Sequence, residues 1–140
     1  MRYLILSFFL ITIGCSKKEA EPIKLNVDQC EFCKMKISDG KFASEIITTK
    51  GRVYKFDDLR CLVSYIHEKN TSVDKSFVND FSKKNSLISI DEAFFLKGGD
   101  ISSPMRGNIA AFKDELQFED YKTKLNATKT NWNEINNLFK

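Results

Sequence analysis

The sequence predicts a small single α+β domain of two ββα-type units with a short C-terminal helix, placed after an N-terminal signal and a tether. Two observations lead to this fold class. A hairpin-like segment is followed by a helix-like segment in the first half, and the second half repeats this order loosely. The chain has 140 residues, enough for one compact core. We expect the domain to cover residues 25–140.

The first unit is a predicted hairpin followed by a helix. Apolar and β-branched stretches at 42–49 and 52–56 flank Lys50-Gly51, which is typical of a β-hairpin. A helix is expected next, because Asp57 can cap it and apolar residues then recur at helical spacing. These apolar residues are Leu59, Leu62, Val63 and Ile66, and the helix should end near Lys69.

The second unit is predicted from residues 92–126. Strands are expected at 92–96 and 108–112 around a Gly-Gly loop, followed by a helix at 114–126. In both halves a Phe at the end of a strand precedes acidic residues that can cap a helix, which is a hint of duplication. Between the units, residues 77–90 favour strand. The closing helix is predicted from the helical spacing of Trp132, Ile135 and Leu138.

Composition and charge exclude several function classes. Hydrophobic residues make up 42% of the chain and charged residues 29%, which is typical of a globular protein. The net charge of +3 is too small to favour a nucleic-acid partner. His67 is the only histidine, which argues against a His-rich zinc enzyme and against a Ser-His-Asp hydrolase built from several histidines. Because no general base, nucleophile pair or phosphate loop is recognisable, we predict no enzyme.

Residues 1–14 are predicted to be an export signal. The mostly apolar run at 3–13 has the length of a signal-peptide core and is too short to span a bilayer. It ends in Gly14-Cys15, which resembles the lipobox of bacterial lipoproteins. This resemblance implies that Cys15 is acylated and anchors the mature chain to a membrane, with residues 15–24 as a flexible tether. An ordinary secretory signal with a chance cysteine is the alternative, and it also takes the protein out of the cytoplasm.

The remaining thiols are Cys30, Cys33 and Cys61, if Cys15 carries the lipid. An odd number of thiols cannot be fully paired within one chain, and a leftover thiol in an oxidising compartment needs a reason to be there. Metal ligation is one such reason.

The Cys30-x-x-Cys33 pair is open to other interpretations. A thioredoxin-type redox pair needs a helix directly after it, because the helix dipole lowers the pKa of the first thiol. Here residues 34–37 lead into a Ser-Asp-Gly turn instead. With Cys61 and His67 the pair would form a nominal Cys₃His zinc set, although these two residues would lie about 120° apart on their helix. A plain structural disulfide is the third interpretation. An exported thiol–disulfide oxidoreductase and a zinc- or disulfide-stabilised structural lipoprotein are thus alternative functions.

Cys61 and two methionines favour a soft metal. On a helical wheel Cys61 lies about 200° from Leu59, opposite the apolar stripe, so its thiol can meet the Cys30/Cys33 loop. Met35 stands beside the cysteine pair, and Met105 lies in a turn between predicted strands. Thiolates and thioethers together favour Cu(I), for which two or three soft donors are enough. In an exported protein this combination predicts copper handling.

These motifs together resemble the NosL family. The resemblance rests on Cys15, Cys30-x-x-Cys33-x-Met35, Tyr54-x-Phe56-Asp57-Asp58-x-x-Cys61 and Pro104-Met105-x-Gly107-x-x-Ala110-Ala111-Phe112. NosL proteins are lipoproteins that act as copper chaperones for the maturation of nitrous oxide reductase. The resemblance implies a small α+β fold, Cu(I) binding without catalysis, and metal transfer through an ABC-type membrane complex to the reductase.

By position, the resemblance implies metal ligands among Cys30, Cys33, Met35, Cys61 and Met105. Not all five can bind one Cu(I), and a Cys30–Cys33 disulfide would leave Cys61 with the methionines. The same resemblance implies a lipid-anchored protein that faces the periplasm of a Gram-negative envelope. A homodimer bridged by the metal is compatible with these donors.

Overall fold

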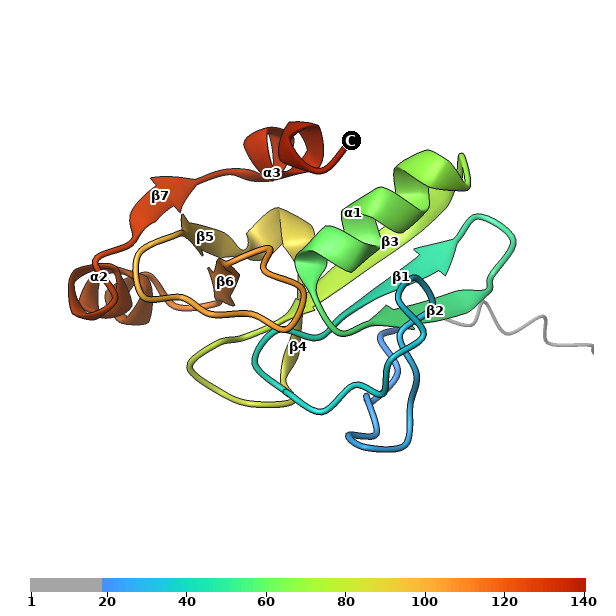
Figure 1. The fold of residues 1–140 in the computed structure, drawn as a ribbon, viewed down its shortest axis with the longest axis horizontal. Coiled ribbons are helices and arrows are strands. Elements are labelled where there is room, and N and C mark those ends of the chain that lie inside the picture. Colours follow the sequence, from blue (N-terminus) through green and yellow to red (C-terminus); the bar gives the residue numbers. More distant parts are fainter. Residues whose placement is uncertain (1–18) are drawn as a thin grey trace, which may run out of the picture.

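The computed structural model describes residues 19–140, so Cys15 and the predicted signal lie outside the described residues. The elements in chain order are β1 (Ser44–Thr48), β2 (Val53–Phe56), α1 (Leu59–Glu68), β3 (Val73–Asn79), β4 (Leu87–Ser89), the 3-10 helix η1 (Ile90–Glu92), β5 (Phe94–Lys97), β6 (Ile109–Phe112), α2 (Glu115–Lys124), β7 (Thr128–Thr130) and α3 (Trp132–Leu138) (Figure 1). The fold is a small α+β domain with two antiparallel sheets, as the sequence predicts.

The two units have the same topology. The first sheet has the strand order β2-β1-β3-β4 and the second the order β6-β5-β7, with antiparallel pairing throughout. In each unit the strand that follows the helix returns to the free edge of the first strand. Each predicted ββα unit is therefore present and is extended to ββαβ, with β4 as an addition to the first sheet.

Between the units, the structure refines the predicted boundaries. The strand-favouring segment 77–90 contains the end of β3, all of β4 and the start of η1. The strand expected at 92–96 begins only at Phe94, because Ile90–Glu92 forms the 3-10 helix that Ser89 caps.

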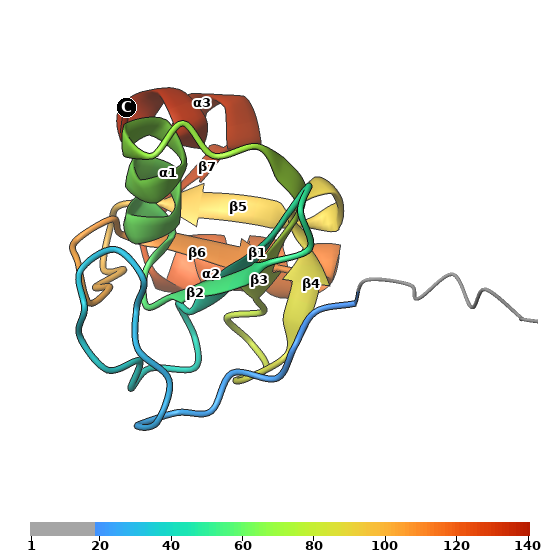
Figure 2. The same cartoon turned by 90° about the vertical axis from the view of Figure 1, so that its right-hand side faces the viewer.

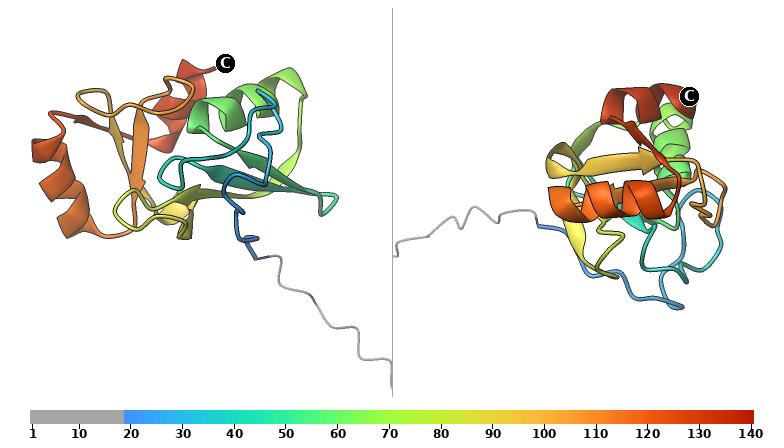
Figure 3. Two further views of the ribbon diagram at one scale, coloured as in Figure 1. Left: turned by 60° about the horizontal axis from the view of Figure 1, so that its bottom comes forward. Right: turned by 90° about the vertical axis from the view of Figure 1, so that its left-hand side faces the viewer.

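Two apolar clusters hold the layers together. The larger cluster lies between the first sheet, α1 and one face of the second sheet, and the smaller one lies between the other face of the second sheet and α2. Figure 3 shows α2 on the side of the second sheet that faces away from α1. The rings of Phe112, Phe118 and Tyr121 pack together in the smaller cluster.

The closing helix α3 packs beside α1 (Figure 2). The hydroxyl of Ser64 donates to the carbonyl of Phe139 at 3.3 Å, and a ring nitrogen of His67 lies 3.0 Å from the side-chain oxygen of Asn136. Of the predicted closing residues, Ile135 is buried, whereas Leu138 is exposed. Among the described residues, we find no helix with the length and apolar character that crossing a membrane requires.

The face of the first sheet opposite α1 is covered by the N-terminal segment 21–28. The backbone N–H of Glu21 donates to the buried carboxyl of Glu45 at 2.9 Å. The ammonium of Lys55 donates to the carbonyl of Pro22 and to the carboxylate of Asp28. Because Ile23 is 1% exposed, packing begins within the stretch 15–24 that the sequence assigns to the tether.

The cap of α1 is Asp58, and the prediction of Asp57 as the cap is wrong. Asp58 has an extended backbone, and its side chain accepts a hydrogen bond from the N–H of Arg60 at 2.9 Å. The first helical residue is Leu59, which is buried, so the residue directly before it takes the capping position. The carboxylate of Asp57 is thereby left for another role.

Candidate metal centre

Three thiols and one carboxylate meet beside the start of α1. The ligand atoms of Cys30, Cys33, Asp57 and Cys61 all lie within 4.8 Å of one another. Cys30, Asp57 and Cys61 are buried, Cys33 is half-buried, and all three cysteines are free. The structure thus brings together the three thiols that the sequence singles out and adds Asp57 to them.

A tight turn positions Cys30 and Cys33. The N–H of Cys30 donates to the carbonyl of Met35 at 2.8 Å, and the N–H of Lys34 donates back to the carbonyl of Cys30 at 3.0 Å. Lys34 adopts a left-handed conformation with φ of 63°, which turns the chain sharply after Cys33. The N–H of Glu31 donates to the carbonyl of Lys55, which fixes this turn to β2. No helix follows the cysteine pair before β1, in contrast to a thioredoxin-type redox pair.

The junction between β2 and α1 positions Asp57 and Cys61. Asp57 directly follows the last residue of β2, and Cys61 is the third residue of α1. Cys61 is 1% exposed although it lies off the apolar stripe of its helix, because the Cys30/Cys33 turn lies against it. Both residues are at the positive end of the helix dipole, which favours negatively charged donors there.

Hydrogen bonds within the cluster separate the acidities of the three thiols. The thiol of Cys61 donates to Cys30, which lowers the pKa of Cys30 to about 7 and raises the pKa of Cys61. Burial raises the pKa of Cys33 to about 11, and its thiol lies 3.5 Å from both carboxylate oxygens of Asp57. Cys30 is therefore the thiol of the cluster that ionises most readily, and a bound metal would displace the remaining protons.

The two methionines that are predicted as metal ligands have different surroundings. Met35 is 53% exposed, and its carbonyl accepts from Cys30 as described above. Met105 is half-buried and packs against the larger apolar cluster, which includes Cys30 and Cys61. Met105 is tied to the start of α1, because its N–H donates to the carboxylate of Asp58 at 2.9 Å and its carbonyl accepts from Arg60 at 3.3 Å.

The nominal Cys₃His set does not form. His67 lies near the other end of α1 and contacts Asn136 of α3. The fourth member of the cluster is Asp57, which sequence reasoning missed because an acidic residue between a strand and a helix is typical of a cap. Two indications were available: Asp57 and Asp58 compete for one capping position, and both belong to the motif that ends at Cys61.

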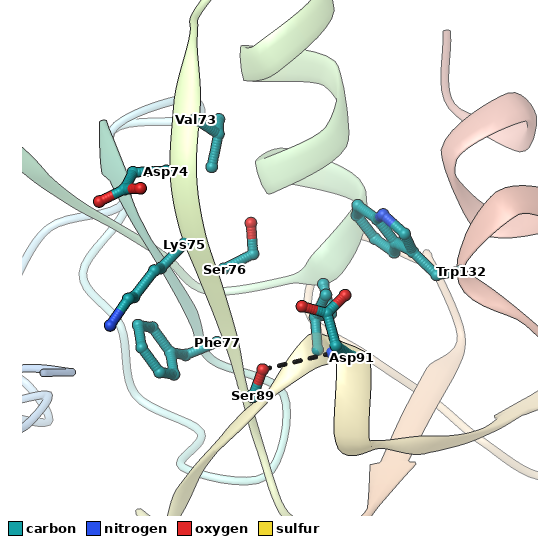
Figure 4. Close-up of a pocket in the computed structure, with 9 residues that line it drawn as sticks. Val73, Asp74, Lys75, Ser76, Phe77, Ser89, Asp91 and Trp132 are labelled. Carbon is teal, nitrogen blue, oxygen red and sulfur yellow. Dashed lines mark hydrogen bonds between the residues drawn. The ribbon is translucent and has the colours of Figure 1, made fainter. Parts of the chain in front are cut away.

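A hollow in the surface is lined by residues other than the thiols. It is bordered by β3, η1 and Trp132, has a volume of about 490 Å³, and is shown in Figure 4. Its lining residues are Val73, Asp74, Lys75, Ser76, Phe77, Ser89, Ile90, Asp91 and Trp132. None of these carries sulfur or imidazole, so this hollow lacks the donors that a soft metal prefers.

The fold and the cluster define a small α+β metal-binding protein with a Cys/Asp site. The NosL family model matches residues 22–138, so the chain belongs to the NosL family. The crystal structure of the copper chaperone NosL from Shewanella denitrificans is 22% identical in sequence, and the match covers 84% of this chain and 96% of that one with a TM-score of 0.73. This likeness shows a shared fold. A search of curated proteins found no match.

Proposed function

We propose that this protein is a lipid-anchored, non-enzymatic Cu(I) chaperone that delivers copper for the assembly of nitrous oxide reductase or a related exported cuproprotein. The observation that carries the proposal is the cluster of three thiols around Asp57. Thiolates are soft donors that favour Cu(I). Membership of the NosL family and the fold of a copper chaperone support the same conclusion.

The burial of the cluster fits metal transfer. Cys30 and Cys61 are covered by protein, whereas Cys33 is half-buried and stands at the edge of the site. An acceptor sulfur or imidazole can approach from that edge and replace the ligands of Cu(I) one at a time. A low-coordinate site with one accessible side suits such ligand exchange better than a closed tetrahedral site.

Met35 and Met105 are the proposed additional donors at the edge of the site. Not all five sulfur residues can bind one Cu(I), so the thioethers would act as alternates that enter or leave the coordination sphere during transfer. Met35 is exposed, and it can move toward the metal or an acceptor without disturbing the core. In this scheme the carboxylate of Asp57 accepts from the thiol of Cys33.

The proposed lipid on Cys15 would keep the domain close to its membrane. Packing against the first sheet starts at Glu21 and Ile23. The stretch from Cys15 to Glu21 can span at most about 20 Å. We propose that the acceptor complex is an ABC-type maturation complex on the same periplasmic face.

The test is an anaerobic Cu(I) titration of the full chain in a mild detergent against a chromophoric Cu(I) chelator, with Zn(II) as competitor. Cys61→Ser removes one thiol of the cluster, and Gln117→Ser changes the corresponding exposed position of α2 as a matched control. We expect tight binding that zinc does not displace, a loss of at least about 100-fold in Cys61→Ser, and no change in the control.

Other outcomes would support the alternative functions. Failure to compete with the chelator, or displacement of copper by zinc, would refute the copper proposal. An oxidoreductase would instead reduce insulin disulfides in a reaction that needs Cys30 and Cys33 and is indifferent to both methionines. A structural lipoprotein would neither bind copper nor reduce insulin.

A further inference from the structure

Asp58 has hydrogen-bond partners in both units. It is 1% exposed, and one carboxylate oxygen accepts from the N–H of Arg60 as the cap of α1. The other oxygen accepts from the hydroxyl of Ser103 at 2.6 Å, the N–H of Met105 at 2.9 Å and the N–H of Gly107 at 3.3 Å. A capping carboxylate needs only the first of these bonds. The other three fix a loop of the second unit, residues 103–107.

The loop is shaped around this carboxylate. The hydroxyl of Ser103 also accepts from the N–H of Asn108 at 2.8 Å. The N–H of Ser103 donates to the side-chain oxygen of Asn108, which closes the loop at its base. A Cβ at Gly107 would collide with the carboxylate of Asp58, so glycine permits the close approach. Hydrogen bonds to a carboxylate are stronger than neutral ones, which makes Asp58 the main attachment of the loop.

This attachment lies next to the metal centre. The residue before Asp58 is Asp57, whose carboxylate belongs to the cluster, and Cys61 follows in the first turn of α1. Met105 packs against the apolar cluster that contains two of the three thiols. The bond between its own N–H and Asp58 thus holds the backbone of Met105 in the loop from which its side chain packs on this apolar cluster.

The corresponding helix cap of the second unit makes no hydrogen bonds to a distant loop among the described residues. Asp114 caps α2 at the corresponding position, and within the described part of the chain its side chain accepts only from the N–H of Gln117, at 3.0 Å. Asp114 is exposed, whereas Asp58 is buried. Capping a helix of this fold therefore requires neither burial nor bonds to a distant loop.

We propose that Asp58 is a positioning residue that holds the thioether of Met105 at the edge of the thiol cluster and so sets how slowly Cu(I) is released. The inference rests on the proposed function. Without the carboxylate, the N–H groups of Met105 and Gly107 lose their acceptor and the loop loosens. The effective concentration of the thioether at the metal then falls, because the same donor spends less time in reach.

The test compares wild type with Asp58→Asn, Met105→Leu, the double variant and Asp114→Asn, each as the full chain in a mild detergent under anaerobic conditions. Asparagine has the shape of aspartate and caps helices well, so Asp58→Asn preserves α1 while weakening the loop attachment. Cu(I) affinity and the rate of release to a chelator are measured. We expect Asp58→Asn and Met105→Leu each to weaken binding about tenfold, the double variant to equal the single ones, and Asp114→Asn to match wild type.

A second measurement follows the methionines directly, without metal. With ¹³C-methyl-labelled methionine, the Met105 resonance should move toward that of a mobile side chain in Asp58→Asn, while the Met35 resonance stays in place. If Asp58→Asn does not fold, Ser103→Ala leaves the cap intact and removes both bonds of the hydroxyl, the one to Asp58 and the one from the N–H of Asn108. It should shift the Met105 resonance and the release rate in the same direction by less.

Three results would overturn the inference. Unchanged Cu(I) affinity and release in Asp58→Asn would refute it alone and leave the chaperone proposal standing. A full effect of Asp58→Asn in the Met105→Leu background would show that Asp58 does not act through this thioether. Absence of Cu(I) binding by wild type would refute the chaperone proposal and this inference together.

Discussion

The two ββαβ units differ most where their helices begin. When they are aligned on Phe56 and Phe112, which end β2 and β6, both helices start at the same distance from the strand and have an aspartate cap. In the first unit Asp57, Asp58 and Cys61 are buried. In the second unit the corresponding residues are Lys113, Asp114 and Gln117, and all three are exposed.

This difference shows that the scaffold alone does not create the metal centre. The start of α1 is covered by the Cys30/Cys33 turn and by loop 103–107, whereas the start of α2 is open to solvent. The Cys30/Cys33 turn brings Cys30 within reach of Cys61, whose hydrogen bond lowers the pKa of Cys30, and loop 103–107 turns the helix cap into an attachment point. The site is therefore a property of what covers the helix.

The first way to test the comparison uses β1 and β5. Strand register places Glu45 where the second unit has Phe95, and both side chains are buried. Desolvation raises the pKa of Glu45 to about 7. The backbone N–H of Glu21 and the ammonium of Lys55 oppose the shift, and the carboxylates of Glu21 and Asp28 reinforce it. One of its carboxyl oxygens has no hydrogen-bond partner among the described residues. The first unit thus contains a buried acid where the second has an apolar ring.

Glu45→Gln should remove a pH dependence of stability. Because the folded-state pKa lies above the ordinary value of 4.5, the stabilisation is complete below pH 4.5 and is lost as pH rises through about 7. We expect the free energy of unfolding of wild type to fall by about 3 kcal/mol from this group between pH 4.5 and 8. Urea unfolding of both proteins across this range measures it, with the exposed Glu92→Gln as control. Parallel pH profiles for wild type and Glu45→Gln would contradict the prediction.

The second test compares the two helix caps. Asp114→Ala should lower the free energy of unfolding by about 1 kcal/mol, the usual cost of losing an exposed cap. Asp58→Ala should cost about 3 kcal/mol, because it also leaves buried donors of loop 103–107 unpaired. Chemical denaturation of wild type and both variants measures these losses. Equal losses would mean that Asp58 serves its own helix alone.

The sequence predicts local features of this molecule better than distant ones. The hairpin around Lys50-Gly51 and the helices follow from short-range patterns, and the structure confirms them. The position of Cys61 off the apolar stripe also correctly indicates contact with the Cys30/Cys33 turn. These features depend on residues close together in the chain or on one helical face.

Distant contacts could not be predicted in the same way. The bond between Asp58 and Ser103 joins residues 45 positions apart, and no local pattern distinguishes such an aspartate from an ordinary cap. Asp57 was missed for the same reason, since its partner Cys33 is 24 positions away. The return of β3 and β7 to the edges of β1 and β5 likewise depends on pairing across the domain.

The last and smallest test concerns the feature that the two units share most closely. After each helix an asparagine, Asn70 or Asn126, has φ of 47°. Its own N–H and the next one donate back to carbonyls of the last helical turn in the same pattern: Asn70 to His67 and Thr71 to Ile66, Asn126 to Thr123 and Ala127 to Lys122. This is the left-handed helix ending that glycine and asparagine favour.

Asn70→Ala and Asn126→Ala should each lower the free energy of unfolding by about 1 kcal/mol, because alanine adopts the left-handed conformation less readily than asparagine. The loss at Asn126 should be a few tenths larger, since its side chain also donates to the exposed carboxylate of Asp100. Thermal or urea unfolding measures both. Clearly unequal losses would mean that the turns differ in strain despite their common geometry. Losses that agree within a few tenths would mean that the turns that direct β3 and β7 back to their sheets are energetically alike.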